Sequence, residues 1–86
     1  MWYIGIDPGK SGGIALIGEV EVEVYPYSDE KLIEIAGRCS GEKCMCCVES
    51  VHALPKQGVS STFSFGKSAG FIEGVLRSFG IAYQLI

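Results

Sequence analysis

The feature that most constrains this chain is a short apolar stretch near its start that ends in one carboxylate. Residues 2–6, Trp-Tyr-Ile-Gly-Ile, are typical of a buried strand, and Asp7 follows at once. Pro8 and Gly9 come next and must end the strand, because proline fixes its own φ and glycine accepts the positive φ of a tight turn. An acid at the carboxyl end of a core strand lies where open α/β sheets place their chemistry. Asp7 is therefore a candidate site residue, although on this stretch alone a plain turn-capping role is equally compatible.

The length and composition indicate one small folded domain, residues 1–86. Apolar side chains make up 48% of the chain, which is ample for a core and too many for a disordered segment. The net charge of −3 gives no broad basic surface, so contact with nucleic acid would be local or would need metal ions to offset acidic side chains. We see neither a signal-peptide pattern nor an apolar run of roughly 18 residues, and expect a cytoplasmic protein without a membrane segment.

Four cysteines raise the question of a zinc site. They are Cys39, Cys44, Cys46 and Cys47. Alternation along a strand sends Cys44 and Cys46 to one face and Cys47 to the other, and no Cys-x-x-Cys pair recurs at zinc-finger spacing. We therefore expect reduced cysteines that pack in the core as small apolar side chains.

Hydrophobic periodicity predicts seven elements in the order β-β-β-α-β-α-β. The expected strands span residues 2–6, 13–17, 19–24, 44–49 and 81–86, and the expected helices span residues 28–36 and about 62–79. Ser28 and Ser61 are the expected N-caps of the two helices, and Gly37 and Gly80 the expected C-caps.

Three of these elements carry further expectations. In the third strand Val20, Val22 and Val24 alternate with Glu19, Glu21 and Glu23, which predicts a valine face on the core and a glutamate face in water. The fourth strand is apolar on both faces and should be central, parallel and covered on both sides. Gly66, Gly70 and Gly74 line one face of the second helix, where each costs about 1 kcal/mol relative to alanine, so we expect close packing on the sheet or across a dimer interface.

The predicted topology brings two carboxylates together. Right-handed crossovers place the fourth strand parallel to the first and next to it, so Asp7 and Glu49 should emerge roughly 5 Å apart. Two neighbouring carboxylates raise a pKa unless a cation lies between them, and hard oxygen ligands suit Mg²⁺ or Mn²⁺. An ion there would bridge phosphate oxygens and activate a water. The residues alone thus indicate an α/β domain with a two-carboxylate metal site.

Three motifs resemble the RuvC-type Holliday-junction resolvases. They are Ile4-Gly5-Ile6-Asp7-Pro8-Gly9 before a glycine-rich second strand, Val48-Glu49-Ser50-Val51 before a polar loop, and Phe65-Gly66-Lys67-Ser68-Ala69-Gly70. The resemblance spans almost the whole chain. It implies a ribonuclease H-like fold with a mixed sheet of order 3-2-1-4-5. It also implies a homodimeric, Mg²⁺-dependent endonuclease that acts on branched DNA and needs no nucleotide cofactor. Asp7 and Glu49 match the first two catalytic acids of that family.

One departure from the family limits what the chain can do alone. The family carries two further acids in a helix well after the fifth strand, whereas this chain ends at Ile86. We therefore expect a truncated ribonuclease H-like domain that lacks its C-terminal helices and is catalytically incomplete.

The resemblance also implies DNA contacts in the stretch after the second acid. Lys56, Gln57 and Phe63 are the candidates there, and Lys10 and Lys67 are further candidates elsewhere. An exposed turn lysine such as Lys10 is more often simply solvated, and Lys67 is a solvated helix residue unless DNA lies across that face. Phe63 is equally compatible with an apolar residue that packs at the start of its helix.

Two functions of other classes remain open. An actin-like ATPase or sugar kinase also opens with a hairpin that grips phosphate after an Asp-x-Gly turn, and ATP-dependent stabilisation would favour it. A non-catalytic module would bind branched DNA or a protein partner without divalent ions and independently of Asp7.

Overall fold

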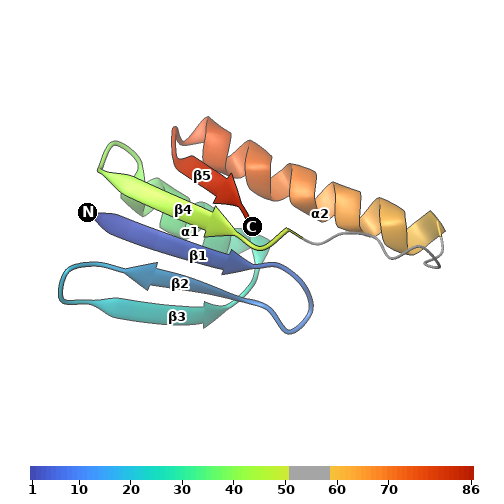
Figure 1. Ribbon diagram of the computed structural model, residues 1–86, viewed down its shortest axis with the longest axis horizontal. Coiled ribbons are helices and arrows are strands. Elements are labelled where there is room, and N and C mark those ends of the chain that lie inside the picture. Colours follow the sequence, from blue (N-terminus) through green and yellow to red (C-terminus); the bar gives the residue numbers. More distant parts are fainter. Residues whose placement is uncertain (51–58) are drawn as a thin grey trace.

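The computed structural model describes residues 1–50 and 59–86, and for residues 59–65 it describes the backbone alone. The described residues form five strands and two helices in the predicted order β-β-β-α-β-α-β (Figure 1). They are β1 (Trp2–Asp7), β2 (Gly13–Ile17), β3 (Val22–Pro26), α1 (Asp29–Cys39), β4 (Cys44–Val48), α2 (Val59–Ser78) and β5 (Ala82–Leu85).

The strands form one mixed sheet in the order β3-β2-β1-β4-β5, as predicted. β1 pairs antiparallel with β2 and parallel with β4, and β5 extends the parallel half. β1 therefore lies at the centre, between the hairpin strands and the two strands that the helices lead into.

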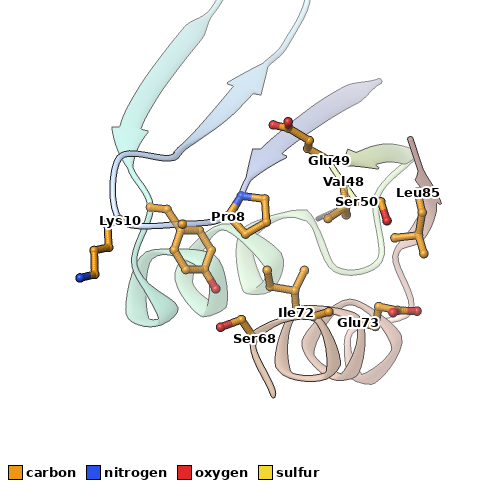
Figure 2. Close-up of a pocket in the computed structure, with 12 residues that line it drawn as sticks. Pro8, Lys10, Val48, Glu49, Ser50, Ser68, Ile72, Glu73 and Leu85 are labelled. Carbon is orange, nitrogen blue, oxygen red and sulfur yellow. The ribbon is translucent and has the colours of Figure 1, made fainter. Parts of the chain in front are cut away.

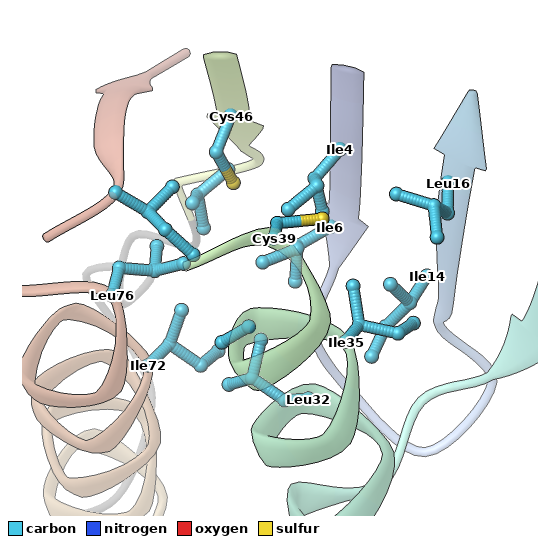
Figure 3. Close-up of a cluster of buried hydrophobic side chains, with 13 residues drawn as sticks. Ile4, Ile6, Ile14, Leu16, Leu32, Ile35, Cys39, Cys46, Ile72 and Leu76 are labelled. Atoms are coloured by element: carbon cyan, nitrogen blue, oxygen red, sulfur yellow. The ribbon is translucent and has the colours of Figure 1, made fainter. Parts of the chain in front are cut away.

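The core lies between one face of the sheet and the two helices (Figure 3). The buried side chains are Ile4, Ile6, Ile14, Leu16, Leu32, Ile35, Ala36, Cys39, Cys46, Val48, Ile72, Leu76 and Ile81. The opposite face, which we call the open face, bears the exposed side chains of Tyr3, Ile17, Val22, Val24 and Met45. Within the described residues, the sheet is thus covered on one side only.

Both helices begin earlier or end later than the sequence predicts. Ser28 caps α1 as predicted, its Oγ accepting a hydrogen bond from the Lys31 amide at 3.1 Å. The predicted C-cap at Gly37 is wrong, because α1 continues to Cys39, which is buried in the core. Ser61 is not an N-cap either, since α2 already begins at Val59. Gly80 follows the end of α2 with a φ of +69°, as predicted.

The prediction for the faces of β3 is wrong. Pairing sets Leu16 opposite Glu23 and Ala15 opposite Val24, so Glu23 lies on the covered face and the valines lie on the open face. Val22 and Val24 are 69% and 70% exposed. Glu23 accepts hydrogen bonds from both terminal nitrogens of Arg38 in α1, at 3.0 and 2.9 Å. The alternation of residue types defines the two faces of the strand but does not show which face meets the helices. The charge-assisted hydrogen bonds from Arg38 stabilise the Glu23 carboxylate on the covered face.

The prediction for β4 is correct in position and wrong in coverage. β4 is parallel to both of its neighbours, but Met45 is 43% exposed on the open face. Cys44 and Cys46 share the covered face as predicted, and the four cysteines are free thiols. Burial raises the pKa of Cys44 to about 11 and that of Cys46 to about 12, so both stay protonated and unreactive near neutral pH.

The glycine stripe of α2 does not pack closely within the chain. Gly66, Gly70 and Gly74 are exposed, and a Cβ at any of them would meet nothing within 4 Å among the described residues. The buried stripe of α2 is formed by Ile72 and Leu76 instead. No helix in the described part of the chain is long and apolar enough to cross a membrane.

The turn between β1 and β2 depends on two glycines. Gly9 has a φ of +128°, which L side chains rarely adopt. Gly12 packs so tightly against the turn that a Cβ there would collide with the backbone carbonyl oxygen of Asp7. The Gly12 carbonyl also accepts a hydrogen bond from the Tyr27 amide at 3.0 Å, which ties the turn to the entry of α1. This turn therefore fixes the backbone that carries Asp7.

Gly12→Ala tests that close packing. We expect it to lower the free energy of unfolding by about 1–3 kcal/mol, because the methyl group must displace the Asp7 carbonyl. Gly5→Ala is the matched control, since a Cβ at Gly5 meets nothing within 4 Å. Urea unfolding of both variants gives the comparison, and equal stabilities would contradict the proposed constraint.

The ion pair of Glu23 predicts a specific loss of stability in acid. The hydrogen bonds from Arg38 and then from Tyr25 lower the pKa of Glu23 from 4.5 to about 2. Because this pKa is lowered on folding, its contribution to stability is present above pH 4.5 and is lost as the pH falls towards 2. In Glu23→Gln, the stability deficit relative to the unmodified chain should therefore shrink across this window in thermal unfolding. The control is Glu21→Gln, at an exposed position without an ion pair in the described part of the chain; a deficit independent of pH would contradict the assignment.

Candidate functional site

Asp7 and Glu49 lie side by side where two parallel strands end. Asp7 is the last residue of β1, and Glu49 directly follows β4. Ile6 pairs with Val48, and the Glu49 amide donates a hydrogen bond to the Ile6 carbonyl at 2.8 Å. The parallel ladder thus continues to the two acids and holds their backbones together, as the sequence predicts.

Both acids belong to the open face of the sheet. Ile6 and Val48 are buried on the covered face. Because side chains alternate along a strand, the residues that follow them, Asp7 and Glu49, lie on the opposite face. Figure 2 shows the Glu49 side chain directed away from α2. A shallow groove of about 430 Å³ adjoins the acids on this side and is lined by Gly5, Ala15 and Cys47 among others. The acids are therefore exposed and accessible from the open face.

The two carboxylates interact directly. The pKa of Glu49 is raised above its usual value, first by a hydrogen bond with Asp7, then by repulsion from the Asp7 charge and by partial desolvation. The Asp7 charge thus makes ionisation of Glu49 less favourable. A divalent cation held by both carboxylates would relieve this repulsion.

The donor set fits a hard divalent cation but does not complete its coordination. Two carboxylates supply the oxygen ligands that Mg²⁺ prefers, and Mg²⁺ commonly retains several waters. Among the described residues there is no group of three or more His, Cys, Asp or Glu side chains that could hold a metal ion. The remaining positions would have to be filled by water, substrate phosphate or ligands from outside the described residues.

The structure describes only some of the residues that are predicted to contact DNA. Lys10 is exposed in the turn after Asp7, close to the acids along the chain. Lys67 is exposed on α2. Phe63 lies in α2 at a position where only the backbone is described, and Lys56 and Gln57 lie outside the described residues.

A second cavity on the helix side of the sheet was not predicted from the sequence. It has a volume of about 520 Å³ and lies between α2 and the carboxyl ends of β1 and β4 (Figure 2). Its lining is mostly apolar and includes Pro8, Tyr27 and Leu85, with Ser68 and Glu73 contributed by α2. The i,i+4 spacing of Glu73 and Arg77 in the sequence indicates an ion pair between them. The sequence does not show that the Tyr83 hydroxyl donates a hydrogen bond to Glu73 and accepts one from Arg77.

Structural comparison identifies the architecture. The chain matches a structure of Thermus thermophilus RuvC in complex with a Holliday junction substrate, with a TM-score of 0.69 and 17% identity, over 100% of this chain and 64% of that one. A second Thermus thermophilus RuvC structure matches with a TM-score of 0.64, 17% identity and coverage of 100% and 63%. No protein-family model and no curated protein sequence matches the chain.

The chain spans somewhat less than two thirds of the length of these RuvC structures. The observed sheet order, with its antiparallel hairpin strands and parallel β1, β4 and β5, is the ribonuclease H-like order that the motifs predict. Over its whole length, the chain therefore has the fold of the RuvC Holliday-junction resolvases.

Proposed function

We propose that this chain is the core of a structure-selective endonuclease that cuts branched DNA, Holliday junctions in particular, with Mg²⁺ or Mn²⁺. The observation that carries the proposal is the pairing of Asp7 and Glu49 at one end of the sheet, in a fold shared with RuvC. One of the similar RuvC structures is a complex with a Holliday junction substrate, which supports branched DNA as the substrate class.

In this proposal Asp7 and Glu49 hold the metal through their carboxylate oxygens. A bound divalent ion supplies Lewis-acid stabilisation of the phosphate and lowers the pKa of an attacking water. The turn at Gly9 and Gly12 fixes the backbone of Asp7, and the β1–β4 ladder fixes that of Glu49. Lys10, exposed in the same turn, is a candidate contact for a DNA phosphate beyond the acid pair, since Figure 2 shows its side chain directed away from Glu49.

We infer that efficient cleavage needs ligands beyond those that the described residues supply. Two carboxylates are too few for a two-metal clamp, and alternation along the strands puts both on the open face. Further acids would therefore approach from the open face, where the exposed side chains of Tyr3, Val24 and Met45 offer an apolar surface to a covering segment.

We also infer that the protein acts as a homodimer. The exposed stripe of Gly66, Gly70 and Gly74 allows another helix to approach the backbone of α2 closely, and Phe71 beside it is 38% exposed. Pairing two copies through this stripe would give one acid pair for each DNA strand that is cut.

The raised pKa of Glu49 gives a direct test of the acid pair. Asp7→Asn should lower the pKa of Glu49 towards 4.5, because the two largest causes of the shift both come from Asp7. Mg²⁺ should act in the same direction on the unmodified chain, since a cation favours the carboxylate. Because the pKa is raised on folding, the unmodified chain should lose stability as the pH rises through the Glu49 pKa, and Asp7→Asn should lose less.

An NMR titration of the Glu49 side-chain carboxyl measures both effects. Asp29→Asn is a suitable control, because Asp29 lies in the first turn of α1 and is not among the causes of the Glu49 shift. A Glu49 pKa that responds neither to Asp7→Asn nor to Mg²⁺ would refute a metal site at this pair.

Cleavage of a synthetic four-way DNA junction in Mg²⁺ tests the function itself. The chain should be compared with the longest natural reading frame that contains it. We expect the longer form to cut and this chain to cut poorly. Asp7→Asn and Glu49→Gln should each slow the longer form by at least about a hundredfold, since each removes a metal ligand.

Glu21→Gln serves as the surface control in that assay and should cut normally. If the longer form does not cut and ATP raises its melting temperature, the phosphate-gripping hairpin of an ATPase is the better interpretation. If junction binding persists without divalent ions and in Asp7→Asn, the chain is a binding module.

A further inference from the structure

Ile86 flanks the acid pair on the open face. The Ile86 amide donates a hydrogen bond to the Val48 carbonyl at 2.9 Å, and the Ser50 amide donates one to the Ile86 carbonyl at 2.7 Å. These bonds continue the parallel β4–β5 ladder, so Ile86 is the partner of Glu49 across one strand spacing of about 5 Å. Both residues line the groove on the open face, and their side chains therefore stand next to each other there.

The two flanks of the acid pair differ in character. On the β2 side, Asp7 pairs with Gly13, which has no side chain. On the β5 side, Glu49 has Ile86 as its neighbour, a branched apolar residue that is 67% exposed. The acid pair is thus open on the β2 side and walled on the β5 side.

This difference favours one direction for the Glu49 carboxylate. Turning towards β5 would place the carboxylate against an apolar side chain and remove part of its hydration, which disfavours the charged form. Turning towards β1 brings it to Asp7, with which it shares a hydrogen bond. Figure 2 shows the Glu49 side chain directed away from Leu85, the last residue of β5. The observed orientation is therefore the one that Ile86 leaves open.

We propose that Ile86 is a positioning residue of the acid pair: its side chain closes the β5 side of Glu49 and holds the carboxylate next to Asp7, where both acids can bind one divalent cation. The part of this inference that concerns the cation rests on the proposed function. A β-branched side chain suits the task, because its restricted χ1 presents a stiff surface. Isoleucine has no metal-binding atom, so Ile86 acts through Glu49 alone.

An NMR titration of the Glu49 carboxyl in Ile86→Ala tests the orientation. We expect the pKa of Glu49 to fall towards 4.5, because the freed carboxylate spends less time beside Asp7. Ile86→Val keeps the branch at Cβ and should restore most of the shift. Ile17→Ala is the matched control, since Ile17 is also exposed on the open face but lies at the other end of β2, opposite Tyr3. An unchanged Glu49 pKa in Ile86→Ala would overturn the proposal.

The same substitution in Asp7→Asn separates orientation from hydration. Ile86→Ala also exposes Glu49 to more water, which by itself lowers the pKa whether or not residue 7 is charged. If Ile86 acts by orientation, its effect requires the Asp7 charge, and the pKa shift should be smaller in Asp7→Asn than in the unmodified chain. Shifts of equal size in the two backgrounds would show that Ile86 only limits hydration, and the positioning role would be wrong.

Binding of Mg²⁺ alone, followed by the amide NMR shifts of Asp7 and Glu49, gives a second readout. Ile86→Ala should weaken this binding about tenfold, as does the loss of other groups that orient a metal ligand. Ile86→Val and Ile17→Ala should bind Mg²⁺ as the unmodified chain does. Equal affinity of Ile86→Ala and the unmodified chain would contradict the positioning role.

The two proposals fail in different ways. Mg²⁺ binding at Asp7 and Glu49 that does not depend on Ile86 would refute the positioning role and leave the metal site standing. An Asp7-dependent shift of the Glu49 pKa in Ile86→Ala, in a chain that binds no Mg²⁺ at the pair, would support the positioning role and refute the metal site on which the proposed function depends.

Discussion

The parallel pairing of β1 with β4 is the contact on which the rest of the structure depends. It is made after a crossover through α1, and it ends with the hydrogen bond from the Glu49 amide to the Ile6 carbonyl. Without this ladder, Asp7 and Glu49 would be separated by more than forty residues of chain with nothing to hold them together. The same crossover places α1 on the covered face of the sheet, so the arrangement that forms the core also brings the two acids together.

Because side chains alternate along the strands, the two faces of the sheet differ in character at the carboxyl ends of β1 and β4. Ile6 and Val48 point into the core, and the acids that follow them point to the open face. The acid pair is therefore exposed, while the cavity on the other side has mostly apolar walls. Glu49 borders both spaces, so it lies at the boundary between the exposed acid pair and the apolar cavity.

The sequence predicts what depends on neighbours along the chain and on general rules of topology. The parallel pairing of β1 with β4, which brings the two acids together, and the alternation of Cys44, Cys46 and Cys47 are of this kind, and the structure confirms them. The full strand order was implied by the resemblance to the RuvC-type resolvases, and the structure confirms it as well. The predicted orientation of β3 was wrong because Glu23 is held on the covered face by Arg38, which lies fifteen residues further along the chain. Arg38 belongs to α1 because this helix continues past Gly37, where the sequence predicted its end. The cavity was missed because its walls come from five separate segments and carry no common pattern.

α2 has an exposed side in addition to the side that packs on the sheet. Ile72 and Leu76 are buried on the sheet, and Gly70 and Gly74 flank Ile72 by two residues on either side. Because successive helical residues turn by about 100°, a separation of two places the glycines on the side away from the core. The proposed contact with a second copy would thus leave the packing of Ile72 and Leu76 on the sheet intact.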